Sequence, residues 1–230
     1  MEISALWYHF LRTLAELMDE FGQDGDVYGE MADETRAGFQ SFWNAERNCL
    51  YDVINPDGTK DDSIRPNQLL AISLTKDLLS QEQQKAVLDL VETELLTPFG
   101  LRSLSPKHKD YKGRYGSGKR SASQYERDIS YHQGTVWAWL LGPWVDARMT
   151  VHGCDDENLR FVSAQIALLL HHHLLFEAGL GTVSEIFDGD APHKAQGCIA
   201  QAWSVAELLR VFSEYPELQG QARALSAAGA

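Results

Sequence analysis

The stretch Tyr131-His132-Gln133-Gly134-Thr135-Val136-Trp137 begins with polar and aromatic residues and then turns apolar, as a helix does when it starts at a polar surface and enters a core. Helical hairpins nested around an axis would place such starts at one end of a barrel, above an apolar centre, and would form a concave site there. Three other segments share this order of residues, at intervals of roughly 65 residues: Glu2–Tyr8, Arg65–Leu70 and Gly197–Trp203.

Apolar residues recur at helical spacing along most of the chain, and hardly any stretch alternates with a period of two residues. The pattern predicts an all-α protein with one domain over residues 1–214 and a C-terminal tail over residues 215–230. The predicted helices cover residues 3–21, 28–43, a segment starting at 66, 80–96, 132–147, 156–178 and 198–214.

Local signals define some of the boundaries. Pro66 suits the first turn of a helix, and Ser80 is expected to cap the next helix by accepting a hydrogen bond from Gln83. The stretch Asn55–Gly58 predicts a turn. Residues 97–127 are rich in Gly, Ser, Lys and Arg and have no helical period, so we expect a long functional loop.

Composition excludes several classes of protein. The net charge of −13 argues against a nucleic-acid partner, which needs clustered cations. The cysteines Cys49, Cys154 and Cys198 are far apart, so we expect neither a disulfide framework nor a zinc site. The sequence has no secretory signal pattern and no apolar run long enough to span a bilayer. We therefore expect a cytoplasmic protein without a membrane partner.

The four helix starts combine flat aromatic rings with amides and an imidazole. Sugars bind to this mixture, because their C–H faces pack on rings and their hydroxyls pair with amides. Each Trp or Tyr taken alone is more often a core residue, and that alternative stays open. The candidate sugar-binding residues are Trp7, Tyr8, Tyr131, Trp137 and Trp203 for ring contacts, and Asn67, Gln68, His132, Gln133 and Gln201 for hydrogen bonds.

Glu185 is the candidate catalytic carboxylate. It lies in a segment bounded by Gly181 and Gly189, between two predicted helices, where a structured loop is expected. A solvated loop acid is the alternative. The run His171–His173 does not predict a metal site, because adjacent helical side chains point about 100° apart. We expect no metal and no other cofactor.

Several strings resemble the glucosidase domain of glycogen-debranching enzymes, the amylo-α-1,6-glucosidases, and they follow its order over nearly the whole chain. The strings are Arg65-Pro66-Asn67-Gln68, Thr97–Leu104, Tyr131–Trp137, Ser184–Gly189 and Gly197–Ser204.

The resemblance implies an (α/α)6 barrel of the six-hairpin glycosidase type. It also implies a role in glycogen catabolism: hydrolysis, with inversion, of α-1,6-linked glucose stubs on glycogen or a limit dextrin. Glu185 would be the general base, and Arg65 and Asp188 would join the sugar-binding residues.

The family places its general acid in a Trp-Met-Asp segment ahead of the helix that begins here at Glu2, and this sequence has no such segment. The barrel is therefore expected to be present only in part, as the C-terminal portion. Two explanations stay open: a truncated gene product, or half of a split enzyme whose second chain supplies the upstream half-barrel. A noncatalytic α-glucan-binding module is an alternative function, and trehalase-like or maltooligosaccharide hydrolysis is an alternative specificity.

Overall fold

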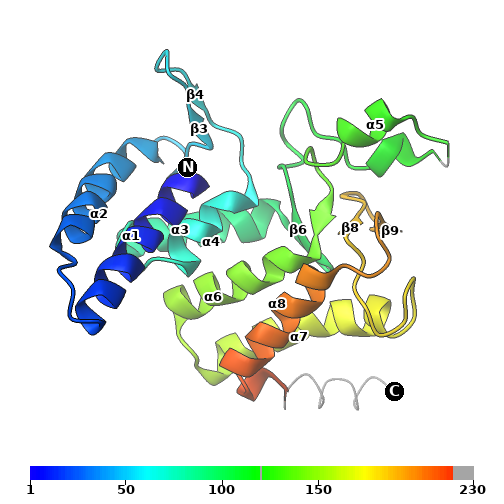
Figure 1. Ribbon diagram of the computed structural model, residues 1–230. Helices are drawn as coiled ribbons and strands as arrows, with labels where there is room; N and C mark the ends of the chain where they lie inside the picture. Colours follow the sequence, from blue (N-terminus) through cyan, green and yellow to red (C-terminus); the bar gives the residue numbers. More distant parts are fainter. Residues whose placement is uncertain (120, 220–230) are drawn as a thin grey trace.

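The computed structural model describes residues 1–119 and 121–219, and most of these are helical (Figure 1). One layer of helices consists of α1 (Glu2–Glu20), α3 (Leu70–Ser73), α6 (Leu141–His152) and α8 (Ala202–Glu214). Each of these helices contacts the next, α1 with α3, α3 with α6 and α6 with α8. The recurring helix starts therefore belong to neighbouring elements, and the predicted nesting of hairpins is confirmed.

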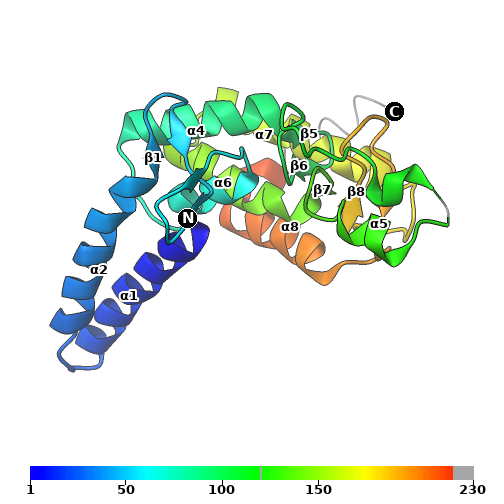
Figure 2. The ribbon, with the colours of Figure 1, turned by 90° about the horizontal axis from the view of Figure 1, so that it is seen from above.

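A second layer packs behind the first. It contains α2 (Asp26–Phe39), α4 (Gln81–Glu94) and α7 (Asp156–Leu169). Helix α2 contacts α1, and α4 and α7 both contact α6. Figure 2 shows α4 and α7 on the side of α6 that faces away from α8. The chain thus alternates between the two layers.

Helix α4 shows how the sequence sets one of these elements. Ser80 accepts a hydrogen bond from the Gln83 backbone N–H at 3.3 Å, and the Gln83 side chain accepts one from the Ser80 N–H at 2.9 Å, so the expected cap is present as a reciprocal capping box. Val87, Leu88 and Val91 are fully buried and share one face of the helix. This face directs α4 toward the core.

The two layers are joined by a polar contact around a buried tryptophan. Trp144 of α6 is completely buried, and its indole N–H donates to Glu92 of α4 at 2.9 Å. Arg148, one turn further along α6, donates to both oxygens of Glu92 at 2.7 and 2.8 Å. The carboxylate is thereby neutralised where it meets the core, as a largely buried charge requires.

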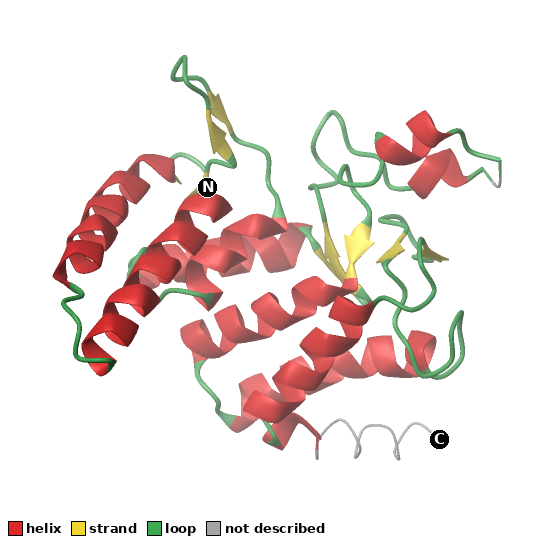
Figure 3. Ribbon diagram, in the orientation of Figure 1, coloured by secondary structure: helices red, strands yellow, loops and turns green. Residues whose placement is uncertain are grey.

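A small antiparallel sheet lies beside the helices (Figure 3). Its strands are β5 (Leu96–Thr97), β6 (Gly100–Arg102), β7 (Val136–Trp137), β8 (Ile186–Phe187) and β9 (Ala195–Gln196), in that order. Our prediction of helices alone did not include it. Strands of two or three residues are too short to show an alternating pattern, which explains why the sequence gives no sign of them.

The helix predicted to start at His132 is wrong in its first part. Residues 136–137 form β7, a 3-10 helix follows at Ala138–Leu140, and only then does α6 begin. Gly134 has φ of +138°, which a side chain would disfavour, and it sits where a Cβ would meet the Tyr111 ring at 2.6 Å. The polar start therefore belongs to a turn and a strand.

Other boundaries also differ. Residues 97–127, expected to be irregular, hold the β5–β6 hairpin, the 3-10 helix η3 (Tyr115–Gly118) and the short helix α5 (Gln124–Asp128). Helix α2 ends before a 3-10 turn at Gln40–Phe42. Helix α7 passes into a π-helical turn at Leu170–Leu174, so the helix predicted to end at 178 is too long.

Near the N-terminal half, β1 (Trp43–Asn44) pairs with β2 (Cys49–Leu50), and β3 (Val53–Ile54) pairs with β4 (Lys60–Asp61) around the predicted turn. Residues 220–230 of the predicted tail lie outside the described residues. Within residues 1–119 and 121–219, no helix combines the length and apolar composition needed to cross a membrane.

Candidate active site

Glu185 immediately precedes β8 and is half-buried, and both of its carboxylate oxygens are held. The Tyr131 hydroxyl donates to Oε1, and the Cys198 backbone N–H donates to Oε2 at 2.9 Å. The Glu185 N–H also donates to the Cys198 carbonyl at 2.9 Å. The direction of the carboxylate is thus fixed by two segments that are distant in sequence.

Gly197 makes this approach possible. Its φ is +69°, a region that favours glycine, and a Cβ at this position would lie 2.5 Å from Glu185 Oε2. Helix α8 starts at Ala202, four residues later than predicted, and residue 198 binds Glu185 instead of forming a helical turn. A glycine at position 197 therefore allows both the turn and the close approach of the Glu185 carboxylate.

Tyr131, which binds Glu185, is the first of a group of aromatic rings that contact one another. The Tyr131 ring meets Trp137 edge-on at 4.9 Å, and His132 stacks on Trp137 with ring centroids 5.0 Å apart and an interplanar angle of 3°. Trp203 contacts Trp137 at 6.0 Å and Trp139 at 5.7 Å. Trp203 remains 47% exposed, so part of the group faces solvent. Such a surface is suited to the C–H faces of a sugar.

A cavity of about 400 Å³ lies against these rings. Five of the residues predicted for sugar binding line it together: Arg65, Asn67, His132, Trp137 and Trp203. The sequence did not indicate that Asp52, Ser103 and Trp139 would also line it. No motif distinguishes Asp52, because its place in the cavity depends on contacts with distant residues, among them its pairing with Arg65.

The Arg65 side chain binds residues of three segments that are distant in sequence. Its Nε lies 3.2 Å from Asp52 Oδ2, and Nη2 donates to Gln133 Oε1 at 3.0 Å. Nη1 donates to the carbonyls of Ser103 at 3.0 Å and His132 at 2.7 Å. Burial raises the pKa of Asp52, and the Arg65 charge opposes that shift. The predicted residues Arg65 and Gln133 therefore hold the cavity wall and are bound to each other.

Other predicted residues are engaged elsewhere. The buried Tyr8 hydroxyl donates to Asp77 at 2.6 Å, and the buried Gln68 side chain accepts from the Leu50 N–H at 3.3 Å. Trp7 stacks on Phe10 in α1, with ring centroids 5.5 Å apart. None of the three lines the cavity with the aromatic group.

Gln201 and Asp188 lie near the site and have local roles. Gln201 is the N-cap residue of α8, and its N–H donates to the Val183 carbonyl at 2.8 Å. Asp188 is buried, and its Oδ1 accepts from the Tyr115 N–H at 2.9 Å. Asp188 lines a second, polar cavity together with Tyr115.

His173 supports the loop that carries Glu185. Its ring is completely buried, and Nε2 accepts a hydrogen bond from the Ser184 N–H at 3.0 Å. Nδ1 lies 3.3 Å from Glu177 Oε2, so the neutral ring carries its proton on Nδ1. The described residues contain no group of three His, Cys, Asp or Glu side chains that could hold a metal ion. His173 is thus a support for the backbone beside Glu185.

This support is expected to make stability depend on pH. Burial lowers the pKa of His173 below its usual value of about 6.5. The unfolded chain therefore takes up the proton first as the pH falls. The contribution of His173 to the free energy of unfolding should be complete above pH 6.5 and should decrease as the pH falls toward the pKa of His173 in the folded state.

Urea unfolding at several pH values between 7.5 and 5 tests this expectation. His173→Gln keeps an acceptor for the Ser184 N–H and does not titrate, so its unfolding free energy should decline less steeply over this range. The exposed His152→Gln serves as the matched control and should keep the wild-type slope. Equal slopes for His173→Gln and the wild type would contradict the assignment.

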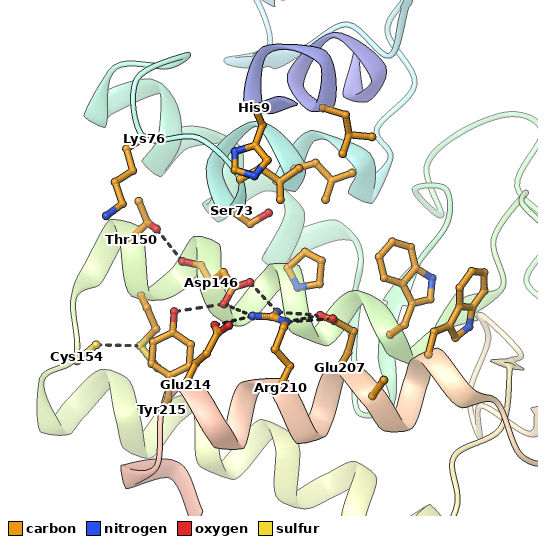
Figure 4. A pocket seen from close by; sticks show the side chains of 18 residues that line it. His9, Ser73, Lys76, Asp146, Thr150, Cys154, Glu207, Arg210, Glu214 and Tyr215 are labelled. Atoms are coloured by element: carbon orange, nitrogen blue, oxygen red, sulfur yellow. Dashed lines mark hydrogen bonds and ion pairs between the residues drawn. The ribbon is translucent and has the colours of Figure 1, made fainter. Parts of the chain in front are cut away.

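A larger groove of about 1020 Å³ adjoins the aromatic cavity and shares Trp139 and Trp203 with it. Figure 4 shows Arg210 of α8 at its centre, surrounded by carboxylates. Arg210 pairs with Asp146 at 2.7 Å, Glu207 at 2.8 Å and Glu214 at 2.7 Å. The pair with Asp146 connects α8 to α6, whereas the pairs with Glu207 and Glu214 lie within α8, the helix that carries Trp203.

Solved structures define the class of fold. The neutral trehalase Nth1 of Saccharomyces cerevisiae matches 97% of this chain and 39% of its own, with a TM-score of 0.66 and 15% identity. The GH63 mannosylglycerate hydrolase of Thermus thermophilus, in complex with glucose, matches 92% of this chain and 44% of its own, with a TM-score of 0.67 and 14% identity. The fold is therefore part of an (α/α)6 barrel of the glycosidase type, as predicted.

Sequence comparison places the chain within that class. The family model described as amylo-alpha-1,6-glucosidase matches residues 1–210, and the chain belongs to this family of glycoside hydrolases. The glycogen debranching enzyme of Saccharomyces cerevisiae is 26% identical over 165 residues, which cover 66% of this chain and 11% of that protein. The resemblance inferred from the motifs is confirmed, and the chain spans a small part of this relative.

Proposed function

We propose that this chain supplies the general base and part of the sugar site of an enzyme that hydrolyses α-1,6-linked glucose stubs on glycogen-type α-glucans, with inversion. The observation that carries the proposal is the fixed Glu185 carboxylate. Two donors, the Tyr131 hydroxyl and the Cys198 N–H, hold it in place. The Tyr131 ring in turn packs edge-on against Trp137, which lines the aromatic cavity. An inverting glycosidase needs such a carboxylate to activate water.

In the proposed reaction, a glucose unit packs against Trp137 and Trp203, and Asn67 and Asp52 accept hydrogen bonds from its hydroxyls. A Glu185 oxygen removes a proton from a water molecule, and the oxygen of that water forms the new bond to the anomeric carbon. The glycosidic bond breaks on the opposite face, and its oxygen takes a proton from a general acid.

We propose that a second half-barrel provides this acid. Helix α1 supports the proposal, because Ile3, Leu6, Trp7 and Phe10 on it are 42 to 69% exposed. An exposed apolar face of this size is typical of a surface that another element covers. Adding a separate chain that carries the upstream half-barrel tests whether such a half-barrel completes the site.

The test measures glucose release from a limit dextrin by this chain, alone and mixed with a chain that carries the upstream half-barrel of a family member. Trehalose and maltooligosaccharides are assayed beside it, and NMR of the first-formed anomer reports inversion. Release from the dextrin by the mixture supports the proposal. Preference for trehalose would overturn the specificity, and glucan binding without turnover in both conditions would favour the noncatalytic alternative.

Tyr131→Phe is expected to lower kcat on the limit dextrin by about 10- to 100-fold, because it removes one hydrogen bond to a charged group, worth roughly 1.5–3 kcal/mol. Burial and the Glu185 carboxylate raise the pKa of Tyr131, so the phenol stays protonated and donates at neutral pH. Dextrin binding should change little, since the ring that packs on Trp137 remains.

Steady-state kinetics and calorimetric binding measure the two effects separately. Tyr125→Phe makes the same chemical change at a side chain that is 71% exposed and should keep wild-type kcat. A wild-type kcat in Tyr131→Phe would show that this hydroxyl does not contribute to catalysis.

A further inference from the structure

A second cavity, of about 430 Å³, lies between η3, α5 and the β8–β9 connection, and its lining is mainly polar. Figure 1 shows α5 above β8 and β9, at the same end of the molecule. Four cationic side chains from these three segments line the cavity: Arg114, Lys119, Arg127 and Lys194. The cavity therefore gathers positive charge in a chain whose net charge is −13.

The positive charge extends over the surrounding segment. Residues 102–127 contain eight of the 20 lysines and arginines in the chain but only two of its 33 acidic residues. A concentration of like charge raises the free energy of the folded state unless a counter-charge is present. Lys107 and Lys119 have a carboxylate partner in Glu94 and Glu126, and an anionic ligand would supply the counter-charge for cations without one.

The four cations are not equivalent. Arg127 is held by the Ala122 carbonyl at 2.5 Å and by Gln124 Oε1 at 3.0 Å, and Lys119 pairs with Glu126 at 3.0 Å. Arg114 and Lys194 have no hydrogen bond or ion pair from their side chains to any other described residue. A would-be Cβ at Gly118 lies 3.3 Å from Arg114 Cδ, so this glycine leaves the room that Arg114 occupies.

The cavity also contains hydrogen-bond acceptors. Asp188 is buried and accepts from the Tyr115 N–H, and Asp190 accepts from the Tyr111 hydroxyl at 3.1 Å. Within the described part of the chain, neither forms an ion pair with a cation of the cavity. The Gln196 amide donates to Asp188 Oδ1 at 3.5 Å, so its own oxygen and the remaining lone pairs of the two carboxylates are the acceptors suited to the hydroxyls of a sugar.

We propose that this cavity binds a phosphorylated sugar. Arg114 and Lys194 bind the phosphate as charge-assisted donors, and Asp188, Asp190 and Gln196 bind hydroxyls. The volume falls in the range of small-molecule sites. The cavity is next to the proposed base, because the Tyr115 ring contacts Tyr131 at 5.9 Å and Tyr131 binds Glu185.

Calorimetry on the whole chain, with glucose 6-phosphate, glucose and inorganic phosphate as ligands, tests the proposal. This measurement of binding does not depend on turnover at Glu185. Glucose 6-phosphate should bind more tightly than either component. Arg114→Gln and Lys194→Gln should each weaken its binding by about tenfold. Lys109→Gln is the matched control, because Lys109 is exposed in the same basic segment but does not line the cavity.

Thermal unfolding of each variant checks that the fold is retained. No binding of glucose 6-phosphate at millimolar concentration, or equal binding by wild type and the Arg114→Gln/Lys194→Gln double variant, would overturn the proposal. Inorganic phosphate binding as tightly as glucose 6-phosphate would overturn its sugar part.

Two further arms distinguish the source of the ligand. Retention of a glucan that carries phosphate monoesters, and not of its phosphatase-treated form, supports a phosphorylated unit within a chain. Binding of free glucose 6-phosphate without such retention supports a soluble sugar phosphate.

Discussion

Glu185→Gln is expected to lower the rate of glucose release from a limit dextrin by about 10²- to 10⁴-fold, measured with the upstream half-barrel present. Glutamine cannot take a proton from water, so the loss should fall on kcat. The amide oxygen can still accept a hydrogen bond from the Cys198 N–H, which holds the loop in place. Dextrin binding, measured by calorimetry, should therefore remain close to wild type.

The control for this variant is Glu34→Gln, the same chemical change at an exposed position on α2. It should retain full activity. If Glu185→Gln kept a rate within a few-fold of wild type, Glu185 would not be the base. If it lost both binding and folding stability, the carboxylate would be a structural group of the β8 loop.

The order and nesting of the helices could be predicted from the sequence because they depend on local and periodic signals. The capping box at Ser80 depends on only four consecutive residues. The apolar face of α4 follows a helical period. The interval between the recurring starts indicated that Arg65, His132 and Trp203 would be near one another. They line one cavity.

The small sheet and the detail of the site could not be predicted, because they depend on contacts between distant segments. Each strand is stabilised by its neighbours in the sheet, not by its own two or three residues. Asp52 is held at the site by its ion pair with Arg65 and by backbone hydrogen bonds to Met1 and Asp61. Conversely, Tyr8 was expected at the site because of its position in a helix start, but its hydroxyl binds Asp77 within the fold.

Arg65→Met is expected to lower the free energy of unfolding by about 3 kcal/mol or more, because removing one partner of a largely buried ion pair leaves the other charge uncompensated. The side chains of Arg65 and Asp52 are only 18% and 13% exposed. The variant also removes the donors to the Ser103 and His132 carbonyls, which join the segments around the cavity. Urea unfolding at neutral pH measures the loss.

The chain offers a matched ion pair as the control. Arg47 lies 2.9 Å from Asp62, and these side chains are 41% and 59% exposed. Arg47→Met should cost less than about 1 kcal/mol, since exposed ion pairs contribute little. Asp52→Asn combined with Arg65→Met should recover part of the loss, because the unpaired charge is then absent. A loss of unfolding free energy for Arg65→Met no larger than that for Arg47→Met would show that the aromatic cavity keeps its shape without the contacts of Arg65. The wall of the cavity would then depend on ring packing alone.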